Sequence, residues 1–298
     1  MLLLPEQLPA KNVFQVHGIS SSGKVLIRKQ LRRAEMKKFF CNLPPCLIGM
    51  EACGGSHYWG RELKKFGHTV KLMAPQYVKP YVKTNKSDQR DAEAICEAVT
   101  RPTMRFVAIK TPEEQAILSL HTVRKGFVKT RTAQGNQIRG LLSEYGIVFP
   151  RGLKSLFNNL PETLEKHAEE LPGIFLGLVE RLLEELKETD RQVNELDNEI
   201  NRHHRASEAS LRLEKIPGIG PLTASVLAVV IGDGKEFKNG RQVAAWLGLV
   251  PKQFSTGGKT ILGSISKRGD CYVRTLLIHG ARSALRWTEP PPSRSAPP

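Results

Sequence analysis

Short apolar runs alternate with amphipathic stretches over the first third of the chain. Two runs rich in β-branched residues, 13–18 and 24–28, flank a Ser-Ser-Ser-Gly turn and predict a pair of neighbouring strands. Apolar runs at 46–50 and 69–73 predict two more strands, and the pattern over 56–66 between them suits a helix. This alternation of strands and helices is typical of an α/β domain.

A polar segment follows these strands and precedes a further helix. Asp88 is of a type favoured at the N-cap, so the sequence predicts a helix over 89–99 that begins after Asp88. A much longer helical pattern covers 113–145. These elements place an α/β domain at 10–110.

The segment 162–200 is acidic, with twelve Asp or Glu against four Lys or Arg. Its apolar positions step by threes and fours, which is the repeat of a coiled coil. They are Phe175, Val179, Leu182, Leu186, Val193, Leu196 and Ile200, interrupted only by Thr189. The partner of this seam is either the helix at 113–145 folding back within the chain or another protomer. We assign 111–208 to long helices and a coiled coil.

The composition changes again after residue 208, to Gly-rich turns and short apolar helices. We expect a small, mainly α C-terminal domain at 209–287. The residues at 288–298 read as a low-complexity tail because they are dominated by Pro and Ser.

The charge balance points to the class of partner. The 298-residue chain has a net charge of +16 and a pI near 9.8, which makes nucleic acid the leading candidate. We expect a cytoplasmic protein without a membrane role, because no apolar run reaches the roughly 20 residues that span a bilayer. The five cysteines lack Cys-x-x-Cys spacing, which argues against disulfides and zinc and predicts reduced, mostly packed thiols.

Three carboxylates stand out against this basic background. Asp88 and Asp91 are three residues apart and share one helix face, and Glu51 follows a buried strand just before Gly54 and Gly55. Hard oxygen ligands suit Mg²⁺ or Mn²⁺, and a pair of such ions can hold the attacking and leaving oxygens of a phosphodiester. The three acids therefore form a candidate metal site, although surface helices often carry such Asp pairs.

The helix at 113–145 contains a stretch, 115–143, with five basic residues and no acidic one. These candidate phosphate contacts are Arg124, Lys125, Lys129, Arg131 and Arg139. A merely solvated helix face is the alternative.

Two features of the C-terminal part also suit nucleic acid. The turn at 216–224 carries Gly218 and Gly220, whose backbone N–H groups can face a phosphate as in helix-hairpin-helix modules; a simple tight turn is the alternative. Further along, Ser255 precedes paired glycines in a basic segment with one acid, Asp270. Its cations include Lys259, Lys267, Arg268 and Arg274. A hydroxyl in this setting is a candidate nucleophile toward phosphorus, and a phosphate-contacting loop is the alternative.

Together these segments resemble the insertion sequence 110 family of transposases, also called DEDD transposases, and within it the 1111-like branch. The resemblance runs from about Ala10 to Arg286. It is carried by Lys11-Asn12-Val13-Phe14-Gln15-Val16-His17-Gly18, Gly49-Met50-Glu51-Ala52-Cys53-Gly54-Gly55, Asp88-Gln89-Arg90-Asp91-Ala92-Glu93-Ala94, Ile216-Pro217-Gly218-Ile219-Gly220 and Ser266-Lys267-Arg268-Gly269-Asp270.

The resemblance implies a RuvC-like, RNase H-related N-terminal domain, a coiled-coil insertion and a C-terminal domain with a serine. It also implies recombination of DNA with four acids, Mg²⁺ and that serine, guided by a bridge RNA within an oligomer, a dimer or tetramer. The second, third and fourth acids match Glu51, Asp88 and Asp91. The serine matches Ser255, with Thr256 as the alternative after a shift of one residue.

Both ends of the chain depart from the family pattern. The first aspartate would stand two residues before Ala10, where the chain has Leu8, and the residues around it do not form the expected apolar strand. Low-complexity residues follow Arg286, where the family continues as helix. We therefore expect an altered copy with reduced transposase activity. A nucleic-acid-binding remnant without catalysis and a RuvC-like junction nuclease are the alternatives.

Overall fold

The computed structural model describes residues 2–4, 12–82 and 87–288. The chain divides into two compact units. The first comprises Met1–Gln115 and Gly232–Cys271, and the second comprises Ala116–Ile231 and Tyr272–Pro298. No helix among the described residues combines the length and the apolar character needed to cross a membrane.

The first unit contains a six-stranded sheet in the order β3-β2-β1-β4-β5-β6. Its strands are β1 (Leu2–Leu4), β2 (Val13–Ile19), β3 (Val25–Arg32), β4 (Leu47–Glu51), β5 (Thr69–Met73) and β6 (Phe106–Val107). β2 and β3 pair antiparallel, as the sequence predicts, and β4 and β5 pair parallel. The predicted strands at 46–50 and 69–73 are confirmed to within one residue.

The opening leucines correct one expectation. We expected no apolar strand ahead of Val13, but Leu2–Leu4 form β1, which pairs antiparallel with β2 and parallel with β4. Leu8, where the family aspartate was expected, lies outside the described residues.

Helices cover both faces of this sheet. α1 (Met36–Cys41) and α2 (Ser56–Lys65) pack on one face, where the core is built from residues such as Phe14, Ile48 and Leu63. α3 (Pro75–Val78) and α4 (Asp88–Val99) form the core of the other face with Met73, Ala94 and Ile95. Two short 3₁₀ helices, Arg33–Glu35 and Lys79–Tyr81, connect these elements. The predicted helices at 56–66 and 89–99 are thereby confirmed.

The N-cap prediction for α4 is wrong by one residue. Ser87 is the cap, and its Oγ accepts a hydrogen bond from the backbone N–H of Arg90 at 3.4 Å. Asp88 is instead the first helical residue. Ser and Asp are about equally favoured as caps, so composition alone does not choose between these neighbours.

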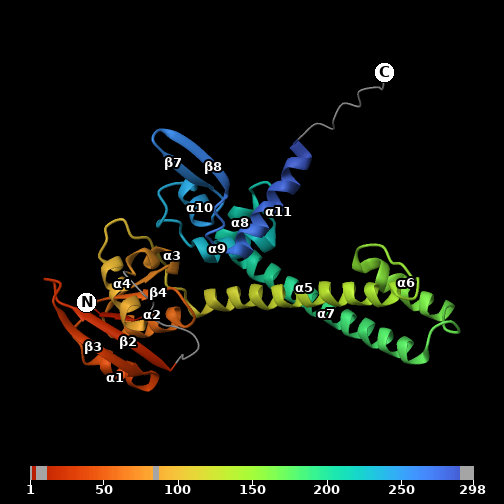
Figure 1. Cartoon of the computed structure of the whole chain (residues 1–298), viewed down its shortest axis with the longest axis horizontal. Coiled ribbons are helices and arrows are strands. Elements are labelled where there is room, and N and C mark those ends of the chain that lie inside the picture. The colour runs from red at the N-terminus through yellow and green to blue at the C-terminus, as the bar shows by residue number, and fades with distance from the viewer. Residues whose placement is uncertain (1, 5–11, 83–86, 289–298) are drawn as a thin grey trace. The chain divides into compact units, whose positions relative to one another are not determined.

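The C-terminal part of the first unit is not purely helical. α10 (Gly240–Trp246) is followed by an antiparallel hairpin of β7 (Pro251–Thr256) and β8 (Lys259–Ile265), labelled in Figure 1. Gly257 and Gly258 form the two-residue turn, both with positive φ. A Gly-Gly pair between two strand-forming runs is a hairpin signal that our mainly α expectation overlooked.

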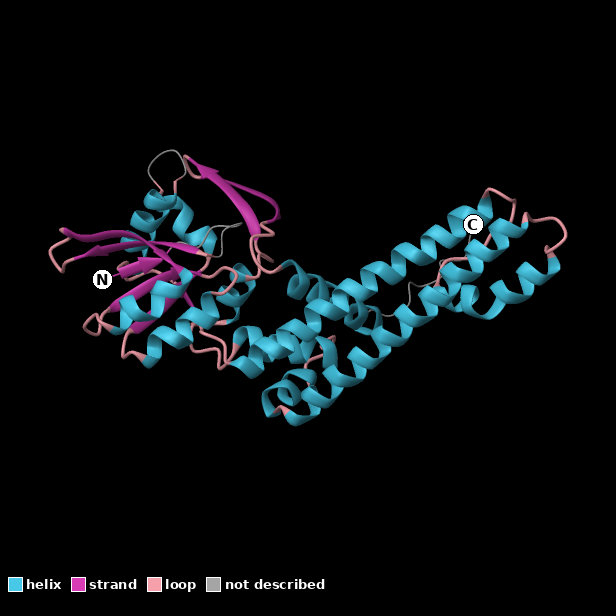
Figure 2. Cartoon of the chain, turned by 90° about the horizontal axis from the view of Figure 1, so that it is seen from below, coloured by secondary structure: helices cyan, strands magenta, loops and turns pink. Residues whose placement is uncertain are grey.

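The second unit is helical. It contains most of α5 (Pro112–Ser143), together with α6 (Leu153–Lys166), α7 (Gly173–Ala206), α8 (Glu208–Glu214), α9 (Pro221–Ile231) and most of α11 (Cys271–Thr288). α5 and α7 run side by side in Figures 1 and 2. The predicted long helix at 113–145 is confirmed.

The apolar seam of α7 is buried within the chain. Phe175, Val179 and Leu186 pack with Ile138 of α5 and Leu160 of α6 in one core. The partner of the seam is therefore the same polypeptide, as in the intramolecular alternative. The seam differs from the predicted one at two positions: Leu183 is buried where Leu182 was expected, and Leu196 is only half-buried.

All five cysteines are free thiols. Cys96 is buried and Cys46 and Cys53 are half-buried, whereas Cys41 and Cys271 are exposed. Burial raises the pKa of the Cys96 thiol to about 12, so this group stays protonated.

Candidate active site and nucleic-acid interface

Glu51 is the last residue of β4 and projects from the face that α4 covers. Alternate residues of a strand point to opposite faces. Ile48 and Met50 belong to the core beneath α1 and α2, whereas Leu47 packs against the core of α4. Glu51 shares the parity of Leu47 and is half-buried. The Ala52 N–H extends the pairing with β5 by donating to the Met73 carbonyl at 2.7 Å, and the chain then turns, with the Cys53 N–H donating to the Glu51 carbonyl at 2.9 Å.

Asp88 and Asp91 lie in the first turn of α4. Asp91 is only 8% exposed and lies on the side of α4 that packs on the sheet, whereas Asp88 is exposed. The N-terminal end of a helix favours negative charge, so this position suits both carboxylates. α4 packs across β2, β1 and β4, which brings the face of Asp91 onto the face of Glu51.

The three acids have the chemistry of a magnesium site but are not gathered into one. Within 2–4, 12–82 and 87–288, no group of three or more His, Cys, Asp or Glu side chains is arranged to hold a metal ion. Carboxylate oxygens are the donors that Mg²⁺ prefers. The donor type therefore fits, whereas the described side chains do not converge on one metal position.

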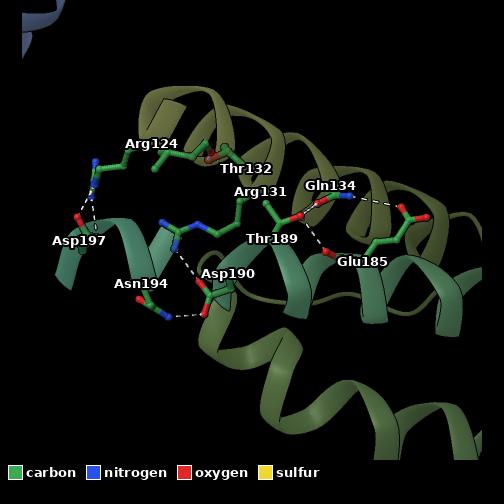
Figure 3. Close-up of polar contacts among 10 residues, drawn as sticks. Arg124, Arg131, Thr132, Gln134, Glu185, Thr189, Asp190, Asn194 and Asp197 are labelled. Atoms are coloured by element: carbon green, nitrogen blue, oxygen red, sulfur yellow. Dashed lines mark hydrogen bonds and ion pairs between the residues drawn. The ribbon is translucent and has the colours of Figure 1, made fainter. Parts of the chain in front are cut away.

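Two of the predicted nucleic-acid contacts on α5 are ion-paired with α7 instead (Figure 3). Arg124 binds Asp197 through two nitrogens, Nε to Oδ1 and Nη2 to Oδ2, in a fork geometry. Arg131 Nη1 donates to Asp190 Oδ1 at 2.6 Å. These arginines therefore join the basic stretch of α5 to the acidic segment of α7, which accounts for the opposite charges of the two segments.

A third predicted contact, Arg139, is also engaged within the chain. Its guanidinium donates to the carbonyls of Gly135, Pro150 and Gly152, and so ties the end of α5 to the loop before α6.

Lys125 and Lys129 lie in a different environment. They stand one turn apart and line an open groove of about 700 Å³ along α5. The other lining residues are Thr122, Gly126, Val128, Thr132, Ala133 and Asn136. The small side chains leave space, the polar ones offer hydrogen bonds, and the two ammonium groups add positive charge. Of the five predicted contacts, these two lysines suit a phosphate backbone best.

The turn at 216–224 joins α8 to α9 and packs tightly against α11. Gly218 has φ of +85°, and a Cβ placed on it would lie 2.5 Å from the Gly280 carbonyl oxygen. Gly220 has open space around its Cα. The two predicted phosphate contacts thus differ, because Gly218 is required for packing whereas Gly220 has room for a ligand.

Ser255, Thr256 and Lys259 lie on the β7–β8 hairpin, whose strands are exposed over nearly their whole length. Gln253 Nε2 donates to Ser255 Oγ at 2.8 Å, so the hydroxyl proton stays free to point away from Gln253. Thr256 is the last residue of β7 and pairs with Lys259 across the turn. The exposed hydroxyl groups are accessible to a large substrate.

Lys267 and Arg268 follow β8 in a constrained loop. Lys267 has φ of +55°, an unusual value for a residue with a side chain, and its N–H donates to the Gly248 carbonyl at 3.0 Å. Arg268 is exposed, whereas Arg274 in α11 is only 7% exposed. Burial makes Arg274 a poorer candidate for direct contact with nucleic acid.

Comparison with known proteins decides the family. The sequence matches the transposase IS116/IS110/IS902 family over residues 210–295 and the DEDD transposases of the IS110 type over residues 9–147. It is 51% identical to a protein of Pseudomonas aeruginosa named as a probable family 20 transposase, over 93% of this chain and 82% of that protein. The chain belongs to the IS110 family of transposases.

Named insertion-sequence transposases are also similar. The transposase for element IS1328 of Yersinia enterocolitica is 43% identical over 94% of this chain and 83% of that protein. The transposase for element IS1111A of Coxiella burnetii is 43% identical over 93% of this chain and 76% of that protein. The resemblance to the insertion sequence 110 family, drawn from the motifs, is therefore confirmed.

One polar cluster of the transposase had no sequence signal. His121 in α5 is 2% exposed and connects three helices: its Nδ1 lies 3.1 Å from Tyr272 Oη and its Nε2 lies 3.0 Å from Ser225 Oγ. Ser225 and Tyr272 each lie more than a hundred positions from His121 in the sequence, so no local pattern could reveal the cluster. Its role is to join α5, α9 and α11 of the transposase.

Proposed function

We propose that this transposase cuts and joins DNA strands with Glu51, Asp88 and Asp91 of the first unit and the Ser255 hydroxyl as nucleophile. The observation that carries the proposal is the shared face: Glu51 ends β4 on the face across which α4 places Asp91. Acids from separate segments on one sheet face are what a phosphodiester-processing site of the RuvC-like type requires.

The proposed chemical step uses the exposed hydroxyl of the hairpin. Ser255 Oγ attacks phosphorus, an O–P bond forms, and the P–O bond to the leaving strand breaks. The hydroxyl proton ends on the leaving oxygen. Because Gln253 donates to Ser255 Oγ, it orients the hydroxyl for this attack and is not itself the base.

Ser255→Ala and Thr256→Ala test the assignment of the nucleophile. The assay is cleavage of a supercoiled plasmid carrying the ends of the element, with covalent protein–DNA species resolved on denaturing gels. We expect Ser255→Ala to abolish both signals and Thr256→Ala to retain most cleavage. If cleavage survives in Ser255→Ala and is lost in Thr256→Ala, the role belongs to the threonine.

We also propose a requirement for Mg²⁺ or Mn²⁺, supported by the carboxylate donors and by the family. Conservative amide variants, Glu51→Gln and Asp91→Asn, are expected to lose cleavage by at least about a hundredfold while keeping their DNA affinity. Glu93→Gln, on the same helix, is the matched control. Equal cleavage with EDTA and with Mg²⁺ would contradict the metal requirement.

A bridge RNA and an oligomeric assembly, a dimer or tetramer, complete the proposal. Co-purification of a defined RNA and its requirement for cleavage test the guide. The RuvC-like fold of 10–110, the coiled coil within 111–208 and the serine-bearing domain at 209–287 belong to the same proposal. The described sheet with α4 across its acidic end, and the pairing of α5 with α7, support the first two parts of this division. The residues of 209–287 are divided between the two compact units.

We also propose that this chain has reduced transposase activity, because Leu8 stands where the family has its first aspartate. Leucine cannot ligate a metal, so Leu8→Asp is expected to raise transposition, measured with the RNA and the DNA ends of the element. Full activity of the unaltered chain would overturn this part alone.

A nucleic-acid-binding protein without catalysis is the second candidate, because the described acids do not converge on a metal position. Strongly salt-dependent DNA binding without any strand cleavage would support it. A RuvC-like junction nuclease would instead cleave DNA branches and tolerate Ser255→Ala.

A further inference from the structure

Strand β3 leaves one of its two rows of side chains uncovered. Ile27 and Leu31 pack into the core beneath α1 and α2, and Lys29 Nζ lies 5.7 Å from the ring of Phe39, which packs on the same core. The alternate residues must therefore face the other way. They are Leu26, Arg28, Gln30 and Arg32, all exposed, and we call them the β3 strip.

The β3 strip lies on the same sheet face as the candidate catalytic acids. Phe14 and Val16 of β2 are buried beneath α1 and α2, so Gln15 between them points to the opposite face, where it pairs across the strands with Gln30. Glu51 and α4 occupy that opposite face too. On this face α4 covers β4, β1 and part of β2, and the exposed strip of the edge strand β3 lies beyond α4.

Distance and register place this strip within reach of one DNA strand. Going from β4 to β3 crosses β1 and β2, three strand spacings or about 14 Å. That span corresponds to about four nucleotides at a rise of 3.4 Å per nucleotide. Arg32 pairs with Val13 at the end of β3 that lies on the Glu51 side of the sheet, so the strip begins near the acids.

The chemistry of the strip fits a phosphate backbone. Among the described residues, neither Arg28 nor Arg32 forms an ion pair with a carboxylate. Arginine presents a fork of donors that matches phosphate oxygens, and the amides of Gln15 and Gln30 add neutral hydrogen-bonding groups between the two cations. By contrast, Arg124 and Arg131 already bind aspartates of α7.

We propose that the β3 strip binds the backbone of the DNA strand that leads away from the phosphodiester cut at Glu51, Asp88 and Asp91. The inference rests on the proposed function and extends it, because it assigns the path of the substrate. The competing explanation is that charges on an edge strand merely prevent sheet-to-sheet aggregation, which any exposed cation at that edge would do.

The test compares two double variants of the full chain with equal charge change. Arg28→Gln with Arg32→Gln removes both positive charges of the β3 strip. Lys24→Gln with Lys29→Gln, the control, removes two exposed positive charges outside the strip: Lys24 lies in the turn before β3, and Lys29 lies on the opposite face of the sheet. The readout is fluorescence anisotropy with labelled single-stranded DNA, and with RNA of the same sequence, over a salt series. Thermal unfolding verifies that each variant folds.

We expect the strip variant to lose DNA affinity by at least about tenfold at low salt. Its slope of log K against log salt should fall by about 1.4, from two lost contacts to a single strand at about 0.7 each. The control should change less than about twofold, and Arg28→Lys with Arg32→Lys should restore most of the binding. Equal losses in both double variants, or a loss confined to RNA, would overturn the proposal. Absence of cleavage in the wild-type chain would count against the proposed function only, because binding is measured separately.

Discussion

Gly218 and Gly280 approach so closely that neither residue can carry a side chain. A Cβ on Gly280 would lie 1.9 Å from the Gly218 carbonyl oxygen, and a Cβ on Gly218 would lie 2.5 Å from the Gly280 carbonyl oxygen. The contact joins the turn between α8 and α9 to the middle of α11. Two backbones can meet this way only where both residues lack Cβ.

Gly280→Ala should therefore destabilise the second unit, by about 1–3 kcal/mol as for overpacked cores. A loss of stability would be informative, because alanine is a better helix former than glycine by about 1 kcal/mol and would otherwise stabilise α11. Gly220→Ala, with nothing within 4 Å of its Cβ, is the matched control and should change stability little. Urea unfolding measures both, and an unchanged midpoint for Gly280→Ala would contradict the packing assignment.

The ion pair of Arg124 with Asp197 should stabilise the pairing of α5 with α7. The two side chains are 17% and 34% exposed, so their attraction is less screened than at the surface. In a double-mutant cycle with Arg124→Gln and Asp197→Asn, we expect a coupling free energy of about 1–2 kcal/mol. The exposed pair of Arg191 with Glu188 is the control and should show a much weaker coupling, because water and salt screen its charges. Equal couplings would refute the distinction.

The sequence predicted the local elements well and their tertiary partners poorly. The strands around Glu51 and the long helix α5 followed from hydrophobic period, which depends on nearby residues alone. The buried seam of α7 shifted from Leu182 to Leu183, because α7 packs on both α5 and α6.

The candidate site shows the same division. Motif residues such as Glu51 and Asp91 were found from the sequence, and their common sheet face could follow only from strand order. The aspartates that pair with Arg124 and Arg131 lie about sixty to seventy positions away in the sequence. The basic residues of α5 were therefore all predicted to be available to nucleic acid, although these two arginines form ion pairs within the chain. Gly218 was predicted to contact phosphate. Its packing against Gly280 could not be predicted, because the two glycines are far apart in the sequence and no local pattern links them.

Lys267 should show opposite effects on stability and on binding. Its φ of +55° is strained for a side-chain-bearing residue, by about 1 kcal/mol or more. Lys267→Gly is expected to relieve that strain, whereas Lys267→Ala keeps it, and both remove the charge. We expect Lys267→Gly to be the more stable variant by about 1 kcal/mol, with DNA affinity equally reduced in both. Equal stabilities would show that the backbone is not strained there.

His121 should make stability depend on pH. Burial, reinforced by the charge of Arg124, lowers the pKa of His121 from 6.5 to about 4. Ser225 Oγ donates to the Leu222 carbonyl, so it accepts from His121 Nε2–H, which leaves Nδ1 to accept from Tyr272. Protonation would place a second N–H against the tyrosine hydroxyl and disrupt this arrangement.

The sign of the pH effect follows from which state binds the proton first. As pH falls below about 6.5, the unfolded chain protonates at His121 before the folded chain does. Stability is thus fully present above that pH and declines toward pH 4, by at most about 1.4 kcal/mol per pH unit. His121→Gln should flatten this decline in urea unfolding at about pH 7.5 and pH 5. His17 and His57, whose pKa values burial also lowers, titrate in both proteins, so their contribution cancels in the difference. An identical pH dependence in wild type and variant would mean that His121 does not titrate in this range.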